Sequence, residues 1–180
     1  KLRTDLSKYD ISWYKPGNKL FILLWYFVNI IFFQNKLLPF YSIKIFLLKF
    51  FGAEVGNGVV IKPGVNIKYP WKLKIGDHVW IGEDVWIDNL DYVYIGNNVC
   101  ISQGAMLLCG NHHYKKTTFD LIIGEITIED GVWIAARSIV TNNITCKEHS
   151  ILLTNSVATN NLDAYTIYRG NPAISIKKRK

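Results

Sequence analysis

Apolar residues recur at every sixth position through most of the chain after residue 54. The fifth position of these hexads is usually a small or apolar residue, and glycine, asparagine and aspartate fill many of the turns between them. An α-helix would repeat every 3.6 residues and a half-buried strand every two, so neither explains a period of six. The apolar first positions are Val55, Ile61, Ile67, Ile75, Ile81, Ile87, Ile95, Ile101, Leu107, Ile128, Ile134, Val140, Cys146, Leu152 and Ala158.

A period of six predicts a three-sided solenoid. Each hexad supplies one short strand and one turn, and the extra dipeptides at 73–74, 93–94 and 126–127 divide the hexads into groups of three. The first residue of each hexad then points toward the axis, and successive coils stack at the spacing of neighbouring strands. We therefore expect an all-β solenoid of about five parallel coils over residues 53–180.

Residues 1–52 lack this period and predict a separate helical region. Gly17 and Asn18 mark the start of a helix, Pro39 interrupts it, and a second helix is expected over Phe40–Phe51. The apolar run 20–33, broken by Asn29, is shorter than the roughly 20 residues that span a bilayer.

The sequence leaves two roles open for this region. The first is to cover the open end of the solenoid. The second, additional role is contact with a membrane surface, because lysines border the apolar run. The residues expected to cover the first coil are Leu20, Leu23, Leu24 and Phe27.

The repeat is interrupted once, by residues 109–125, between the third and fourth coils. The interruption contains "HHYKKTTFDLIIGE", which is polar at its start and lacks the hexad pattern. Loops that project from rigid scaffolds carry function disproportionately often. We therefore expect one protruding loop, and we expect His112, His113 and Tyr114 within it to mark the functional site.

Several motifs together resemble one family. "IKPGVNIKYPWKLKIGDHVWIGEDVWIDNL", "VCISQGA", "GNHHY", "VWIAA" and "RGNPA" are similar to segments of the hexapeptide-repeat O-acetyltransferases of colanic acid and exopolysaccharide biosynthesis. That family is related to the galactoside and maltose acetyltransferases, and the resemblance covers nearly the whole chain. It implies a left-handed parallel β-helix, acetyl-CoA as donor without a metal, a sugar or glycan hydroxyl as acceptor, and a homotrimer with sites between subunits.

The resemblance also implies a general base. The family motif places the catalytic histidine directly after Ser or Asn, which here is Asn111, so the base is His112. The family usually has Asp at the next position, where this chain has His113. This departure leaves open what orients the imidazole of His112.

Further site residues follow from the same resemblance and from the stacking of coils, which puts Asp88 beneath Leu108 and Asp84 beneath Gly104. Ile174 stands where the family usually has Arg, so contacts to the coenzyme phosphates would fall on other basic residues. The residues expected to contact the acceptor are Asp84, Asp88, Asn89, Asn111 and Tyr114. The residues expected to contact the coenzyme are Trp133, Ala135, Ala136, Thr159, Arg169 and Lys177.

Composition narrows the alternatives. The net charge of +7 favours an anionic partner, and three cysteines without metal spacing favour a reduced, cytoplasmic protein, with the inner membrane face as an additional location. A zinc hydratase would need three histidines on adjacent coils, whereas His78 and His149 lie far from the loop. Nucleic-acid binding is disfavoured because the basic residues cluster at the termini without a stacking platform. A non-catalytic scaffold remains the alternative, because the C-terminal coils lack most turn glycines.

Overall fold

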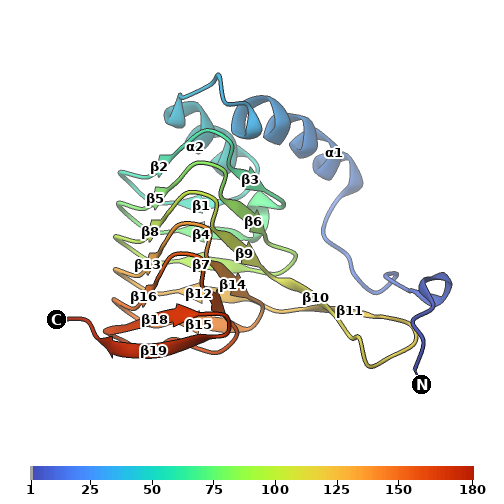
Figure 1. Ribbon diagram of the computed structural model, residues 1–180. Coiled ribbons are helices and arrows are strands. Elements are labelled where there is room, and N and C mark those ends of the chain that lie inside the picture. The colour runs from blue at the N-terminus through green and yellow to red at the C-terminus, as the bar shows by residue number, and fades with distance from the viewer. Residues whose placement is uncertain (1) are drawn as a thin grey trace.

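The hexads fold as three parallel sheets that form the faces of a column. The computed structural model describes residues 2–180, and its strands stack coil upon coil along one axis (Figure 1). The first face comprises β1 (Glu54–Val55), β4 (Leu73–Ile75), β7 (Val93–Ile95), β12 (Ile126–Ile128) and β15 (Ile144–Cys146). The second face comprises β2 (Val60–Ile61), β5 (Trp80–Ile81), β8 (Cys100–Ile101), β13 (Trp133–Ile134), β16 (Ile151–Leu152) and β18 (Thr166–Gly170). The third face comprises β3 (Asn66–Ile67), β6 (Trp86–Asp88), β9 (Met106–Leu108), β14 (Ile139–Thr141) and β17 (Val157–Ala158).

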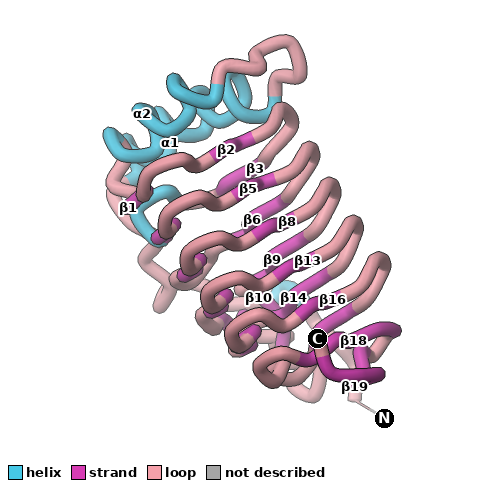
Figure 2. The backbone as a smooth tube through the Cα atoms, turned by 90° about the vertical axis from the view of Figure 1, so that its left-hand side faces the viewer, coloured by secondary structure: helices cyan, strands magenta, loops and turns pink. Residues whose placement is uncertain are grey.

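The first residues of the hexads form the core, as the sequence predicts. From Val55 to Ala158, each of them is exposed by 9% or less, because it points toward the axis of the column. The parallel register pairs first residues with one another, for example Ile61 with Ile81 and Ile87 with Leu107. Figure 2 shows the resulting regular stack of coils from the side.

The column has six coils, one more than expected. Leu162 bridges to Cys146 on the first face, and β18 continues the second face beyond β16. The link from Ala158 to Leu162 spans four residues, whereas the corresponding link from Ile67 to Ile75 spans eight. This shortened link hides the last coil from a count based on regular spacing.

The turn residues form ladders along the column. The Asp77 carboxylate accepts a hydrogen bond from Asn57 N, the Asn97 side chain accepts one from Asp77 N, and the Asp130 carboxylate accepts one from Asn97 N. Gly76 is required at this corner because a Cβ there would lie 2.6 Å from the Asn97 Oδ1 atom. The turn motifs of the sequence therefore satisfy main-chain donors of successive coils.

Helices cover the N-terminal end of the column (Figure 1). They are α1 (Lys19–Val28), the π-helix η2 (Asn29–Gln34) and α2 (Tyr41–Phe50), and Asn18 caps α1 by accepting hydrogen bonds from Leu20 N and Phe21 N. Two 3₁₀ turns, η1 (Leu6–Lys8) and η3 (Pro70–Lys72), complete the helical elements. None of the helices in the described part of the chain has the length and apolar content needed to cross a bilayer.

The sequence-based choice of covering residues was wrong. Leu20, Leu23, Leu24 and Phe27 are 48–65% exposed and lie on the opposite side of α1 from Trp25. The apolar run carries apolar residues on all sides, so periodicity did not show which side would face the column. The side chains that are buried over the first coil are those of Trp25, Phe33, Leu48 and Phe51.

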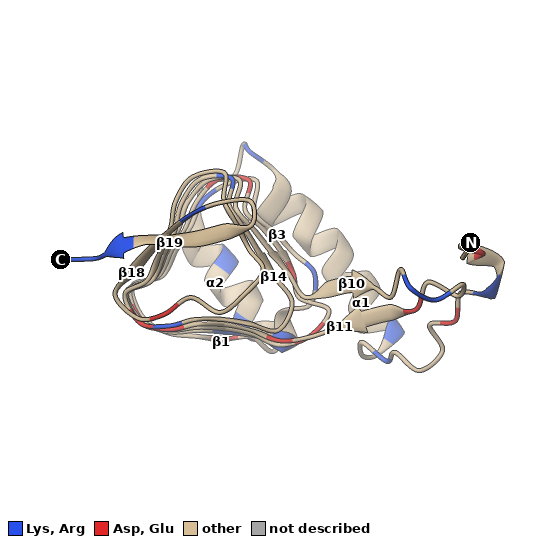
Figure 3. Cartoon of the chain, turned by 60° about the horizontal axis from the view of Figure 1, so that its bottom comes forward, with Lys and Arg blue, Asp and Glu red and all other residues tan. Residues whose placement is uncertain are grey.

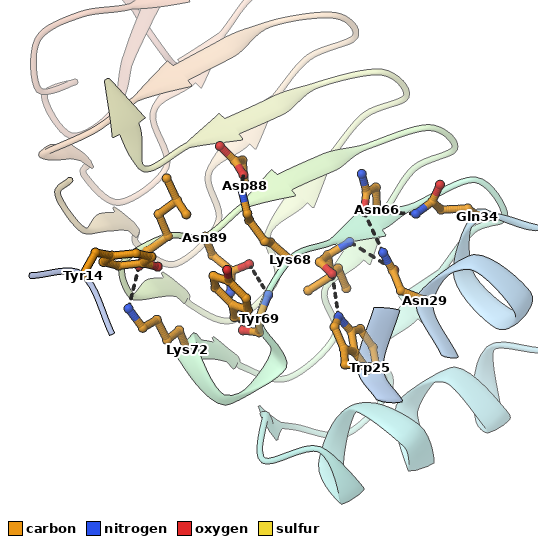
Figure 4. A network of polar contacts seen from close by, with 12 residues as sticks. Tyr14, Trp25, Asn29, Gln34, Asn66, Lys68, Tyr69, Lys72, Asp88 and Asn89 are labelled. Carbon is orange, nitrogen blue, oxygen red and sulfur yellow. Dashed lines mark hydrogen bonds and ion pairs between the residues drawn. The ribbon is translucent and has the colours of Figure 1, made fainter. Parts of the chain in front are cut away.

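Polar side chains of the helices satisfy the open edge of the first coil. Trp25 Nε1 donates to Ile67 O at 2.8 Å, and Asn29 accepts from Ile67 N at 3.3 Å while donating to the Asn66 side chain at 2.7 Å (Figure 4). Lys44 is buried, and its Nζ donates to Lys62 O at 3.0 Å. Burial lowers the pKa of Lys44 below its usual value. The single polar residue within the apolar run, Asn29, thus replaces the partner that a preceding coil would supply.

The C-terminal end is closed differently, by strand addition. Strand β19 (Ala173–Lys178) pairs antiparallel with β18, and it thereby covers the edge of the second face. Arg179 donates to the carbonyl oxygens of Gly131 and His149 at 3.1 and 3.2 Å. Arg179, one of the four basic residues of the C-terminal tail 177–180, therefore helps to hold the last coils together.

Candidate active site

The interruption in the repeat forms a two-stranded hairpin. Strands β10 (Gly110–His112) and β11 (Leu121–Ile123) pair antiparallel, with His112 opposite Leu121. The hairpin leaves the column after β9, at the corner between the third and first faces, and returns at β12. Figure 3, which looks along the column, shows it projecting well outside the stacked coils.

His112 is held in one orientation by Phe119. The Nδ1 atom lies 3.0 Å from the Phe119 carbonyl oxygen, and the two rings stack with centroids 4.4 Å apart. A carbonyl oxygen accepts hydrogen bonds only, so Nδ1 carries a proton, and in the neutral form of the ring the free lone pair lies on Nε2. Phe119 has a φ of 53°, an uncommon conformation for a residue with a side chain. This backbone carbonyl therefore orients the imidazole without an acidic neighbour.

His113 has a different environment from His112. It lines a cavity of about 360 Å³ together with Asp10, Trp13 and Lys116, and its N–H donates to Asp120 O at 2.8 Å. The two adjacent histidines therefore contact different groups. Phe119 contacts the ring of His112, both through its carbonyl oxygen and through its own ring.

The segment before the first helix also reaches the hairpin, which the sequence did not indicate. Asp5 N donates to Thr117 O at 2.8 Å, and the Tyr9 ring lies 5.9 Å from the His112 ring. Further along, Tyr14 donates through its hydroxyl to Leu90 O at 2.6 Å. This segment has no periodic pattern and no motif, so the only signal in the sequence was its aromatic residues.

Cys109 precedes the hairpin and is buried. Burial raises the pKa of its thiol to about 12, so the sulfur stays protonated near neutral pH and is a poor nucleophile. Cys109 is therefore a weaker candidate for chemistry at this corner than the nearby imidazole. Within residues 2–180, no three His, Cys, Asp or Glu side chains gather in a way that would hold a metal ion.

The residues expected to contact the acceptor divide into two groups. Asp88 lies opposite Leu108, near the base of the hairpin, and forms an ion pair with Lys68 at 2.9 Å. Asn111 and Tyr114 are exposed on the hairpin. Asn89 is fully buried, and both polar atoms of its side chain bond the main chain of Tyr69, so we leave it out of the site proposed below.

Asp84 belongs to the other group, at the corner between the second and third faces. It has a φ of 57° and forms an ion pair with Lys36 at 2.9 Å. It lines a cavity of about 520 Å³ with Gln103 and Arg137. Asp84 therefore lies at a different corner from Asp88 and the hairpin.

Three of the residues expected to contact the coenzyme lie at or next to this same corner. Trp133 is exposed on the second face, and its Nε1 donates to the Ser102 hydroxyl at 2.9 Å. Ala135 and Ala136 follow in the turn, where Ala135 is buried and Ala136 is partly exposed. The Ala135 N–H donates to Leu152 O at 2.9 Å, so the partly exposed Ala136 is the residue of this turn that a ligand could approach.

The remaining coenzyme candidates are spread over the last coils. Thr159 follows β17, Arg169 lies on β18 and Lys177 on β19, and all three are exposed. Lys178 and Arg179, in contrast, donate hydrogen bonds to Thr166 and to main-chain carbonyls. The cations that remain available for phosphates are therefore fewer than the sequence of the tail indicates.

Within one chain, His112 and the expected coenzyme residues of the β13–β14 turn lie at different corners of the column. His112 projects from the corner between the third and first faces, whereas Ala135 and Ala136 occupy the corner between the second and third faces. The whole third face separates these corners. A site that uses both therefore requires a second copy of the chain.

No protein-family model matches the chain, but individual proteins do. It is 34% identical over 176 residues to the protein named "Putative colanic acid biosynthesis acetyltransferase WcaF" of Escherichia coli, covering 97% of each chain. Among solved structures, a hexapeptide-repeat acetyltransferase from Vibrio cholerae superposes with a TM-score of 0.81 at 21% identity, covering 90% of this chain and 92% of that one. The structure of that acetyltransferase with acetyl coenzyme A gives the same TM-score at 20% identity, covering 90% of this chain and 88% of that one.

The likeness to the Vibrio protein shows the same fold, and the likeness to WcaF extends over the helical region, the column and the hairpin alike. The chain therefore belongs to the acetyltransferase family of WcaF.

Proposed function

We propose that this protein is an acetyl-CoA-dependent O-acetyltransferase that acts on a sugar hydroxyl, with His112 as the general base. The substrate class is a sugar of exopolysaccharide, capsule or lipid-linked glycan biosynthesis, which follows the name of WcaF. The donor follows the acetyl coenzyme A complex of the Vibrio protein. The observation that carries the proposal is the fixed imidazole, whose Nδ1 is engaged by the Phe119 carbonyl and whose Nε2 is free to accept a proton.

The reaction needs one proton carrier. The Nε2 atom of His112 takes the proton from the sugar hydroxyl as its oxygen attacks the thioester carbonyl. The Ala136 N–H is the candidate in this turn to stabilise the oxyanion that forms, because the Ala135 N–H already donates to Leu152 O at 2.9 Å. When the tetrahedral intermediate collapses, the C–S bond breaks, the acetyl group stays on the sugar oxygen, and the imidazolium returns its proton to the coenzyme thiolate.

We further propose that the active species is a homotrimer in which each site is shared. The hairpin of one subunit would meet the corner of Ala135 and Ala136 on its neighbour. The separation of these corners within one chain supports this arrangement. The free thiols of Cys100, Cys109 and Cys146 support a reducing, cytoplasmic location.

Subunit mixing tests the shared site directly. His112→Ala and Ala136→Phe are each expected to inactivate the trimer, the second by filling the approach to the turn. If the site is shared between neighbours, each mixed trimer contains one interface with both native residues, so co-expression should restore about a quarter of the wild-type activity. Activity that stays at the level of the single variants would contradict the shared site. Two variants that both lie on the hairpin, His112→Ala and Asn111→Ala, are the matched control, because their mixture restores no native pair.

A non-catalytic binding role is the second candidate. It is favoured by Ile174, which stands where the family usually has Arg, and by the engagement of Arg179 in the fold. Calorimetric titration with acetyl-CoA, combined with a thioester-cleavage assay with and without sugar acceptors, separates the two. Coenzyme binding without turnover on any acceptor would favour the binding role.

A further inference from the structure

The helical region presents a second apolar face, on the side away from the column. Its side chains are large, apolar or aromatic, and exposed, and the aromatic contacts of Phe27, Phe46 and Phe50 are with rings of their own helix or the residue that follows it. We call this set the outer face. It consists of Leu20, Leu23, Leu24, Phe27, Ile30 and Ile31 from α1 and η2, and Ile43, Phe46 and Phe50 from α2.

The outer face lies opposite the residues that cover the first coil. On α1, Leu23 and Phe27 flank Trp25 in sequence and therefore lie on the other side of the helix from it. On α2, Phe46 and Phe50 lie away from the buried Lys44 and Leu48. A helix that is apolar all round is normally enclosed by other apolar groups. Here one side is enclosed by the column and the other is open.

The helices of this region are too short to span a bilayer. Helix α1 continues directly into η2, and together they cover residues 19–34, about 24 Å of helix, whereas the 10 residues of α2 correspond to about 15 Å; both are shorter than the roughly 30 Å hydrocarbon core of a bilayer. The helices can therefore lie in an interface but not cross it. Exposed apolar surfaces of this extent on a soluble protein mark a contact with another apolar phase.

The charge pattern around the outer face favours an anionic membrane surface as that apolar phase. The sequence has no Asp or Glu between residues 11 and 53. Lys15, Lys19 and Lys49 are exposed in this stretch, while Lys36 is engaged with Asp84. Exposed Tyr26 and Tyr41 add the amphipathic rings that favour membrane interfaces. A positive rim around an apolar face is complementary to a surface of anionic lipid headgroups.

A second copy of the chain fits this face less well. An end-to-end contact between two outer faces would bring together two surfaces that both carry lysines and have no carboxylate between residues 11 and 53 to pair with them. A side-by-side contact between columns would leave the outer face uncovered, because the helices lie across the end of the column (Figure 1).

We propose that the outer face docks on the surface of an anionic phospholipid membrane, with α1 and α2 lying in the headgroup region and the column standing away from it. Three columns side by side would present three such faces to one plane, so weak contacts would add. An acceptor sugar held on a lipid carrier would then be concentrated beside the hairpins. The docking itself depends only on the outer face and not on the proposed reaction.

Vesicle flotation of the full-length protein tests the docking. We expect the protein to float with phosphatidylcholine vesicles that contain phosphatidylglycerol, and to float much less with phosphatidylcholine alone or at high salt. The double variant Phe27→Ser, Phe46→Ser should lower the partition coefficient about tenfold or more, because two rings lose their apolar contact. Lys19→Gln with Lys49→Gln should weaken binding at low salt only.

Matched controls isolate the outer face. Ile174→Ser changes an equally exposed apolar residue at the opposite end of the column, and Lys177→Gln changes a tail cation, so neither should alter flotation. All the substituted side chains are exposed, and thermal melting verifies that the variants fold. A wild-type protein that stays unbound, or a double variant that floats as well as the wild type, would overturn the proposal. So would light scattering that shows the lipid-free wild type at twice the mass of the double variant, because a second copy would then cover the face.

Discussion

The column and the hairpin it carries are stabilised in different ways. In the column, each coil repeats the contacts of the one below, so Ile61, Ile81 and Ile101 occupy equivalent buried positions along one face. In the hairpin, no contact repeats: His112 depends on the Phe119 carbonyl, on the Phe119 ring and on Tyr9 from the distant N-terminal segment. An imperfect coil therefore still packs on similar coils, whereas the orientation of His112 depends on a single set of partners.

This contrast predicts that substitutions in the two regions lower different quantities. A change in the column should lower the free energy of unfolding while folded molecules keep their activity. A change in the hairpin should lower activity while the unfolding transition stays in place. The four predictions below run from the largest expected effect to the smallest.

His112→Ala should have the largest effect. Loss of the general base should lower kcat/KM for acetyl transfer by about 10²–10⁴-fold, which corresponds to about 3–5 kcal/mol of transition-state stabilisation. Thermal melting should show the column unchanged, because the side chain is outside the core. His113→Ala is the matched control, since its ring has no contact with the Phe119 carbonyl. Equal losses in the two variants would contradict the assignment of the base.

Ile101→Ala tests the column itself. Ile101 is fully buried between Ile81 and Ile134, so truncation should cost about 2–5 kcal/mol of unfolding free energy through lost burial and a cavity. Denaturant titration measures the loss, and specific activity per folded molecule should stay near the wild-type value. Ile122→Ala, in the hairpin and partly exposed, is the control and should cost much less. A comparable cost at both positions would show that the hairpin folds as part of the column.

Asn29→Leu tests the open end of the column. The substitution keeps the size of the side chain but leaves Ile67 N and the Asn66 side chain without this partner, at a cost of about 1–3 kcal/mol. Denaturant titration should detect the loss, with the apolar cover by Trp25 and Phe33 retained. Asn35→Leu, outside the first-coil edge, is the comparison. A neutral result for Asn29→Leu would mean that apolar cover alone closes this end.

Phe119→Leu should have the smallest effect. It removes the ring stacked on His112 and keeps the carbonyl that holds Nδ1, and an aromatic pair of this kind contributes about 0.5–1.5 kcal/mol. We expect kcat to fall about two- to tenfold with little change in KM for acetyl-CoA. Phe119→Tyr keeps the ring and should restore kcat. A fall confined to KM would assign Phe119 to substrate binding instead of the positioning of His112.

The sequence by itself determined the column and the place of the hairpin. A period of six with apolar first residues is a local property, because each coil packs on a near-identical neighbour and the same pairing recurs. The interruption at 109–125 located the hairpin, whereas His112 was singled out by the resemblance of "GNHHY" to the family motif, and its role as base stays a prediction. The sequence did not predict the sixth coil, because its link, from Ala158 to Leu162, departs from the regular spacing.

Only the tertiary structure decided what surrounds these elements. The Phe119 carbonyl reaches His112 because the hairpin turns back on itself, and Tyr9 reaches it from over one hundred residues away. The apolar run offered no periodicity to separate Trp25 from Leu23, so the side that covers the column followed from where polar groups such as Asn29 could satisfy the first coil. These contacts join segments with unrelated local patterns. The physical reason is that a repeat specifies its own neighbours, whereas a unique contact is chosen by the competition of all segments for the same buried surface and hydrogen-bonding groups.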